Sequence, residues 1–190
     1  MVEFAGYSLP VQYEGLGVLK EHVKSTIHPV IATANNIDAQ VHTRAPNSAS
    51  LFDVSHMGQI KWHGKDAIKF LEQLVVGDLA SLKHGEGKLS LIMNEEGGIV
   101  DDTVITNAHG YVYMVVNGAC KYKDMEHFKK YILSTPMEVS LEYLNTQQLV
   151  ALQGKGAMDV MKRITPDIDY TKMNFMTGFD TKIAGAFFVP

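Results

Sequence analysis

Three short β-strand patterns that follow one another between residues 88 and 117 constrain the fold most. They read KLSLIM (88–93), IVDDTVIT (99–106) and YVYMVVN (111–117). The connections between them, NEEGG and NAHG, are short and contain glycine, as is typical of hairpins between antiparallel strands. This segment therefore predicts a three-stranded antiparallel meander.

Helical patterns follow and precede this segment. Apolar residues at helical spacing predict an amphipathic helix over residues 66–76 and a second helix over residues 121–133. The apolar stripe of the second helix is expected to consist of Tyr122, Met125, Phe128 and Ile132. Later patterns predict strands at 138–144 and 147–154, a short helix at 156–164, and a last strand at 182–190 without an evident partner downstream. The order predicts an α+β fold of antiparallel β-meander sheets with packed helices.

Composition and charge argue against several classes of partner. Hydrophobic residues make up 46% of the 190 residues and charged residues 20%, which is typical of a soluble globular protein. A net charge of −4 with scattered basic residues gives no basic surface for nucleic acid. The single cysteine, Cys120, cannot form an intrachain disulfide, and no apolar run is long enough to cross a bilayer. We expect a monomer with no nucleic-acid or membrane partner.

Metal and phosphate motifs are weak in this sequence. No pair of the eight histidines has the helical spacing with an intervening glutamate that marks a zinc site, so no metal is expected. The segment GEGKLS (85–90) lacks the first glycine of a phosphate-binding loop, where Leu82 stands, and has Leu89 at the Ser/Thr position. No G-x-S-x-G motif indicates a hydrolase.

The adjacent carboxylates Asp101 and Asp102 interrupt the strand pattern at 99–106. Aspartate is a poor strand former, and a carboxylate that faces a packed interior is costly without a partner. Strand alternation places Asp102 with Val100, Val104 and Thr106, and Asp101 on the opposite face with Ile99, Thr103 and Ile105. The pattern leaves open which carboxylate enters a pocket, and the residues alone favour the simpler reading of a strand with one solvated face.

The segment LFDVSHMGQ (51–59) combines apolar and polar residues. It is interpreted as a strand or tight turn in which Asp53, Ser55 and His56 cap neighbouring backbone, or alternatively as a ligand site. Met57 fits either a core position or the wall of a site for a flat heterocycle.

Six segments together resemble the aminomethyltransferase family, the T-protein of the glycine cleavage system, and they occur in the family's order. They are FAGYSLPVQY (4–13), SLFDVSHMGQ (50–59), LEQLVVGDLASL (71–82), LSLIMNEEGGIVDDTVIT (89–106), VVNGAC (115–120) and LVALQG (149–154). The resemblance implies an enzyme that takes an aminomethyl group from the dihydrolipoyl arm of lipoylated H-protein. It implies tetrahydrofolate as cofactor, with 5,10-methylenetetrahydrofolate and ammonia as products.

The family's site residues carry over to five positions. The second aspartate of the DD pair faces the pterin in this family, which assigns Asp102 both a catalytic and a cofactor-binding role. Met57, Leu89 and Val104 are implied to line the folate site, and Asn117 to hydrogen-bond the pterin edge. Asp101 is left as a structural residue of the pair. For a eukaryotic source the family implies the mitochondrial matrix, although no targeting segment is visible.

Departures from the family pattern affect the domain assignment. The family continues past Pro190 through a GYTGE segment and folate-binding arginines, and Lys155 replaces the proline that normally follows LQG. We expect a folate-binding domain at 1–145 and an incomplete second α+β domain at 146–190. Two other readings stay open: a folate-binding relative without transfer activity, of the iron–sulfur assembly type, and an inactive, poorly folded fragment.

Residues 23–40 have no counterpart in the family pattern, which resumes directly at Val41. The segment begins with Val23, whose codons start with GT, and ends with Gln40, one of whose codons is CAG. These are the ends of an intron, so we expect either a translated intron or a genuine surface insertion.

Overall fold

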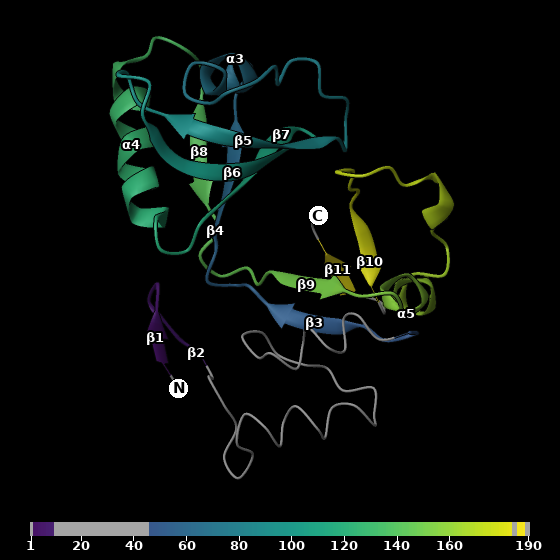
Figure 1. Ribbon diagram of the computed structural model, residues 1–190. Coiled ribbons are helices and arrows are strands. Elements are labelled where there is room, and N and C mark those ends of the chain that lie inside the picture. The colour runs from purple at the N-terminus through teal and green to yellow at the C-terminus, as the bar shows by residue number, and fades with distance from the viewer. Residues whose placement is uncertain (1, 10–45, 184–185, 189–190) are drawn as a thin grey trace. The chain divides into compact units, whose positions relative to one another are not determined.

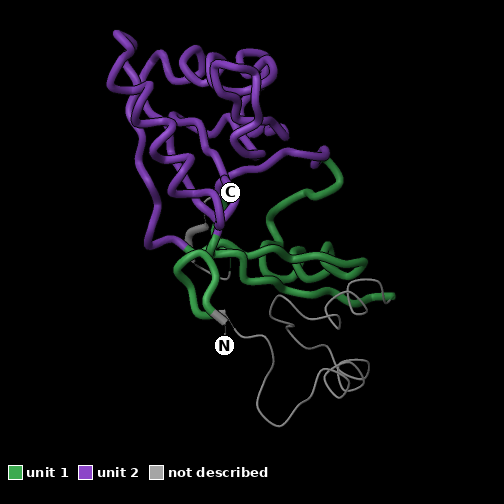
Figure 2. Tube along the Cα trace, turned by 60° about the vertical axis from the view of Figure 1, so that its left-hand side comes forward, with its two compact units in different colours: residues 1–56, 148–172, 181–188 green, residues 57–147, 173–180, 189–190 purple. Residues whose placement is uncertain are grey.

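The computed structural model describes residues 2–9, 46–183 and 186–188 (Figure 1). The insertion predicted at 23–40 lies outside these described residues and stays a prediction. The chain divides into two compact units (Figure 2). Unit 1 comprises residues 1–56, 148–172 and 181–188, and unit 2 comprises residues 57–147, 173–180 and 189–190.

Unit 2 contains a five-stranded antiparallel sheet in the order β5-β6-β7-β4-β8. Its strands are β4 (Gly58–His63), β5 (Gly87–Met93), β6 (Ile99–Ala108), β7 (Tyr111–Val116) and β8 (Ser140–Tyr143). Strands β5, β6 and β7 confirm the predicted meander. The fold is α+β with antiparallel sheets, as predicted.

One face of this sheet, here called the inner face, packs against two helices. These are α3 (Ala67–Leu71) and α4 (Lys121–Ser134), which contribute Phe70 and Phe128 to the core. The ring of Trp62 on β4 lies 5.7 Å from that of Phe70 and 5.0 Å from that of Phe128. Burial of each such side chain stabilises the fold by roughly 1.5–3 kcal/mol. The inner face is thus the hydrophobic core of unit 2.

The first helix is shorter than the predicted range 66–76. It ends at Leu71 because the chain then turns and runs beside β5, where Val75 forms an isolated bridge with Ile92. The backbone N–H of Val76 also donates to the carbonyl of Leu91 at 3.0 Å. β-Branched valines favour this extended conformation over a further helical turn. The helical prediction is therefore wrong beyond this point.

The second helix is confirmed, but its predicted apolar stripe is partly wrong. Its buried residues are Lys121, Asp124 and Phe128, whereas Tyr122 is 66% exposed. The buried side of α4 therefore includes ionisable residues that an apolar pattern cannot indicate. No helix among the described residues has the length and apolar character needed to cross a membrane.

Unit 1 is built from short paired strands and a helix. Strand β3 (Ser50–Asp53) pairs antiparallel with β9 (Val150–Gln153), which is followed by α5 (Ala157–Ile164) and the 3-10 turn η1 (Tyr170–Lys172). Two hairpins join β1 (Val2–Phe4) to β2 (Tyr7–Leu9) and β10 (Thr181–Ile183) to β11 (Ala186–Phe188). The expectation of one unpartnered strand at 182–190 is wrong, because this segment takes part in a hairpin.

The units group the chain differently from the expected domains 1–145 and 146–190. The chain leaves unit 2 after Gln147, close to the expected boundary. Residues up to His56, however, belong with residues 148–172, because β3 forms its ladder with β9. This long-range pairing makes unit 1 discontinuous in sequence.

Candidate functional site

The second face of the unit 2 sheet, here called the outer face, carries three of the predicted site residues. Leu89 on β5 is the cross-strand partner of Val104 on β6, and Leu91 is the partner of Asp102. Residues at alternate positions of a strand share a face, so Leu89, Asp102 and Val104 lie together. Leu89 is 65% exposed and Asp102 is exposed. The outer face therefore presents an apolar pair beside a carboxylate.

The other two predicted site residues lie at the ends of neighbouring strands. Met57 directly precedes β4 and Asn117 directly follows β7. Gly58 and Val116 are cross-strand partners, so the next positions outward, Met57 and Asn117, are adjacent in the ladder direction. Both are half-buried. The sheet register thus gathers all five predicted residues in one part of unit 2.

The two aspartates lie on opposite faces, as strand alternation predicts. Asp101 is 8% exposed and shares the inner face with Thr103 and Ile105. The alternation fails immediately before it, because Ile92 pairs with Asp101 while Met93 pairs with Ile99, which leaves Val100 as a β-bulge. Val100 packs against the core, and Ile99 is exposed, so the predicted faces of these two residues are wrong.

The bulge determines the direction in which the side chains of Asp101 and Asp102 point. An extra residue bends a strand and reorients the side chains that follow it. The Nζ atom of Lys123 on α4 donates a hydrogen bond of 2.6 Å to the carbonyl oxygen of Val100, the extra residue. This bond gives the carbonyl group of the extra residue a hydrogen-bond partner.

Asn117 connects the two carboxylates across the edge of the strand. Its side-chain amide donates hydrogen bonds to Oδ1 of Asp101 at 2.9 Å and to Oδ1 of Asp102 at 2.7 Å. Its backbone N–H donates to Oδ2 of Asp101 at 3.1 Å. Both amide hydrogens are then used, and the amide oxygen is the group left to accept a hydrogen bond from a ligand.

A buried carboxyl group lies behind Asp101, and sequence reasoning missed it. Asp124 of α4 is 0% exposed, and burial together with the Asp101 carboxyl raises its pKa to about 7. Burial acts to raise the pKa of Asp101 too, but the hydrogen bonds from Asn117 and the neighbouring side chain of Asp124 outweigh it and lower that pKa. The spacing of Lys121, Asp124 and Phe128 along one side of a helix was the available signal.

A cavity of about 290 Å³ opens on the outer face beside Val104. It is lined by Gly87, Val104, Thr106, Tyr113 and residues 176–178. The Tyr113 hydroxyl donates a hydrogen bond of 2.7 Å to Oε1 of Gln59, and burial raises the pKa of Tyr113 to about 12. Of the predicted site residues only Val104 lines this cavity.

The segment LFDVSHMGQ uses its polar groups for backbone capping, which confirms that reading for two residues. Oδ1 of Asp53 accepts a hydrogen bond from the backbone N–H of Ser55 at 3.0 Å. The Ser55 hydroxyl donates to the carbonyl of Leu149 at 3.3 Å and accepts from its N–H at 3.0 Å. Across the described ranges 2–9, 46–183 and 186–188, no three His, Cys, Asp or Glu residues form a metal-binding group.

Known proteins resemble this chain over nearly its full length. Residues 1–189 match the family model described as the GCVT N-terminal domain. The chain belongs to this family. The family predicted from the sequence motifs is therefore confirmed.

Relatives of this GCVT domain are aminomethyltransferases. The chain is 41% identical over 190 residues to the mitochondrial aminomethyltransferase of Dictyostelium discoideum, covering 97% of this chain and 42% of the relative. It is 40% identical over 189 residues to that of Homo sapiens, covering 97% of this chain and 41% of the relative.

A solved structure has the same fold. This is the glycine cleavage system aminomethyltransferase T from Bartonella henselae, with a TM-score of 0.72 and 32% sequence identity. The match covers 94% of this chain and 43% of that chain. The GCVT domain thus spans less than half the length of these relatives.

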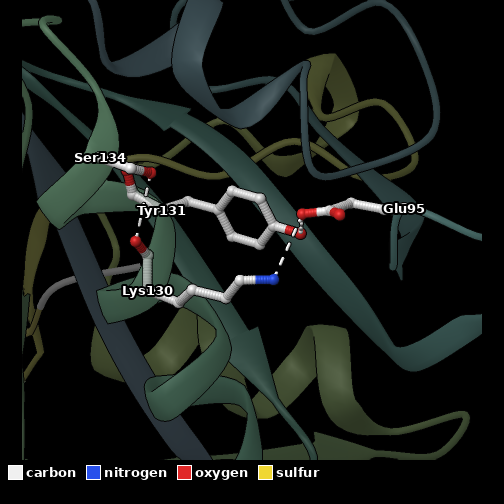
Figure 3. A network of polar contacts seen from close by, with 4 residues as sticks. All are labelled: Glu95, Lys130, Tyr131 and Ser134. Carbon is white, nitrogen blue, oxygen red and sulfur yellow. Dashed lines mark hydrogen bonds and ion pairs between the residues drawn. The ribbon is translucent and has the colours of Figure 1, made fainter.

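Hydrogen bonds connect the turn that leads into β6 of the GCVT domain to α4. Oε1 of Glu95 accepts hydrogen bonds from the Tyr131 hydroxyl at 2.8 Å and from Nζ of Lys130 at 3.2 Å (Figure 3). The hydrogen bond from Tyr131 and then that from Lys130 lower the pKa of Glu95. Within the turn, Oδ1 of Asn94 accepts from the N–H of Gly98 at 2.6 Å. These contacts hold the start of the strand that carries both aspartates.

Proposed function

We propose that this GCVT domain supplies the pterin side of a tetrahydrofolate site in an aminomethyltransferase of glycine cleavage. The proposed reaction takes an aminomethyl group from the dihydrolipoyl arm of lipoylated H-protein and gives 5,10-methylenetetrahydrofolate and ammonia. The names of the relatives support the reaction class. Because those relatives are named mitochondrial, the mitochondrial matrix is the proposed location.

The residues of the outer face fit a flat heterocycle with polar edges. Leu89 and Val104 provide an apolar surface, and the amide oxygen of Asn117 can accept from a ring N–H. Met57 stands at the adjoining strand end with a polarisable side chain suited to a ring face. The cavity beside Val104 extends this surface.

The single observation that carries the proposal is the hydrogen bond from the Asn117 amide to Asp102. It fixes the carboxylate on the exposed outer face at the end of a rigid ladder. When bound, tetrahydrofolate supplies the nitrogen atoms that take up the one-carbon group. In this proposal Asp102 stabilises positive charge that develops on an attacking nitrogen and accepts its proton.

Calorimetric titration of tetrahydrofolate into the purified chain under reducing conditions tests the binding part of the proposal. We expect saturable binding that Asp102→Asn weakens, because the substitution keeps the side chain's shape and removes its charge. Asp159→Asn, an exposed position on α5 of unit 1, serves as the matched control and should bind as the unchanged chain does.

Turnover with lipoylated carrier, in a protein of the relatives' full length that contains this domain, tests the catalytic part. Asp102→Asn should lose far more turnover than stability. Near-normal turnover in this variant would remove the catalytic role of Asp102. Folate binding without any transfer activity would instead favour a binding module.

A further inference from the structure

The carboxyl group of Asp124 is buried beside a second carboxyl group, that of Asp101. The side chain is 0% exposed, and neither of its oxygens receives a hydrogen bond from an N–H or O–H donor among the described residues. Its polar contact is the side chain of Asp101 on β6. Two ionised carboxylates cannot bond each other, so this contact requires a proton on one of them.

The proton belongs on Asp124 because Asp101 is the better supplied acceptor. Asp101 already receives two hydrogen bonds from Asn117, one at each oxygen, and these favour its ionised form. Full burial and the negative charge of Asp101 disfavour the ionised form of Asp124. The positive charge of Lys123 on the same helix favours that form, but it is the smaller effect. Burial and this repulsion raise the pKa of Asp124 to about 7.

We propose that Asp124 is a positioning residue, whose neutral carboxyl group donates a hydrogen bond to Asp101 and thereby holds Asn117 and Asp102 in their binding geometry. The link runs from the buried side of helix α4 through the inner face to the exposed carboxylate on the outer face. The value of this link for folate binding rests on the proposed function. The link itself can be measured without ligand.

Ionisation of Asp124 breaks the link. Above neutral pH the pair carries two buried negative charges, and the repulsion displaces Asp101 from the amide of Asn117. The amide then no longer orients Asp102. We therefore expect the outer-face geometry to depend on pH although Asp102 itself is exposed.

The experiment follows the side-chain amide signals of Asn117 by NMR in the labelled full chain, from about pH 5 to about pH 9. In the unchanged chain these signals should move with a midpoint near the Asp124 pKa of about 7. Asp124→Asn keeps a neutral donor of the same shape, so its signals should keep their low-pH positions throughout. Asp124→Leu has no donor, so its signals should be displaced at every pH, while Asp159→Asn should match the unchanged chain.

Tetrahydrofolate affinity across the same pH range gives a second readout. The unchanged chain should lose about fivefold to tenfold in affinity above neutral pH, the size expected for one lost hydrogen bond, and Asp124→Asn should not. If the Asn117 signals of both Asp124 variants had the same positions and the same pH dependence as those of the unchanged chain, the proposal would be overturned even if folate binds. Absence of folate binding at every pH would instead count against the proposed function, while the amide signals would still decide on the positioning role.

Discussion

The side-chain amide of Asn117 donates a hydrogen bond of 2.7 Å to Oδ1 of Asp102. The second hydrogen of the same amide is used on the neighbouring residue in the sequence, Asp101, at 2.9 Å. One amide therefore holds two carboxylates that strand alternation directs to opposite faces of the sheet. The four predictions that follow test this arrangement and the core that supports it.

Replacement of Asn117 by alanine should destabilise the chain. It leaves the buried carboxylate of Asp101 without a side-chain donor from that residue, and a buried group that loses its partner costs about 1–3 kcal/mol. Urea denaturation followed by circular dichroism measures the change in the free energy of unfolding. Asn145→Ala, at an exposed position after β8, is the matched control and should change little. Equal stability of the two variants would refute the bridging role of Asn117.

The stability of the chain should fall as the pH rises from about 4 to about 7, owing to Asp124. Its folded pKa of about 7 lies above the ordinary value of 3.8, so the folded state binds the proton more tightly. The contribution of Asp124 to the free energy of unfolding is fully present when the pH is below its ordinary pKa of 3.8. It is lost as the pH rises to the folded pKa of about 7. It amounts to at most about 4 kcal/mol, since one pKa unit corresponds to about 1.4 kcal/mol.

The Asp124→Asn variant provides the measurement for this pH dependence. Chemical denaturation at a series of pH values should show that the variant lacks the fall seen in the unchanged chain. The lowered pKa of Asp101 acts in the opposite sense and removes stability only in strong acid. Parallel stability profiles for the two proteins between about pH 5 and about pH 8 would contradict the assignment.

Truncation of Phe128 to alanine should be among the costliest single changes. Its ring is 0% exposed and meets Trp62 edge to face at 5.0 Å, so the substitution leaves a cavity in the core. Losses of this kind are about 3–5 kcal/mol. Phe175→Ala, at a side chain that is 91% exposed, should have little effect on the thermal midpoint. Similar midpoints for both variants would mean that α4 is not packed as described.

A methyl group at Gly58 should disturb the junction of β4, β7 and α4. A Cβ atom there would lie 2.6 Å from Cγ2 of Val116 and 3.0 Å from Cβ of Lys121. Overpacking of this kind costs about 1–3 kcal/mol. Val116→Ala should relieve the clash, so the double variant should lose less stability than the sum of the two single variants. Additive losses would show that the contact does not limit the site.

The sequence determined the elements whose patterns are local. Hydrophobic alternation and glycine-containing turns were enough to predict β5, β6 and β7, and helical spacing was enough for α4 and α5. The motifs also identified the family that the comparisons confirmed. These features depend on residues that lie close together in the chain or on motifs that can be read directly.

Only the tertiary structure decided which carboxylate faces outward. Alternation separates Asp101 from Asp102, but it cannot say which side of the sheet the helices cover, because that depends on long-range packing. The same packing ends α3 where the chain joins β5, pairs β3 with β9, and buries Asp124 beside Asp101. A carboxyl group enters a core only where a hydrogen-bond partner from a distant segment offsets the cost, and that partner is not visible in the local sequence.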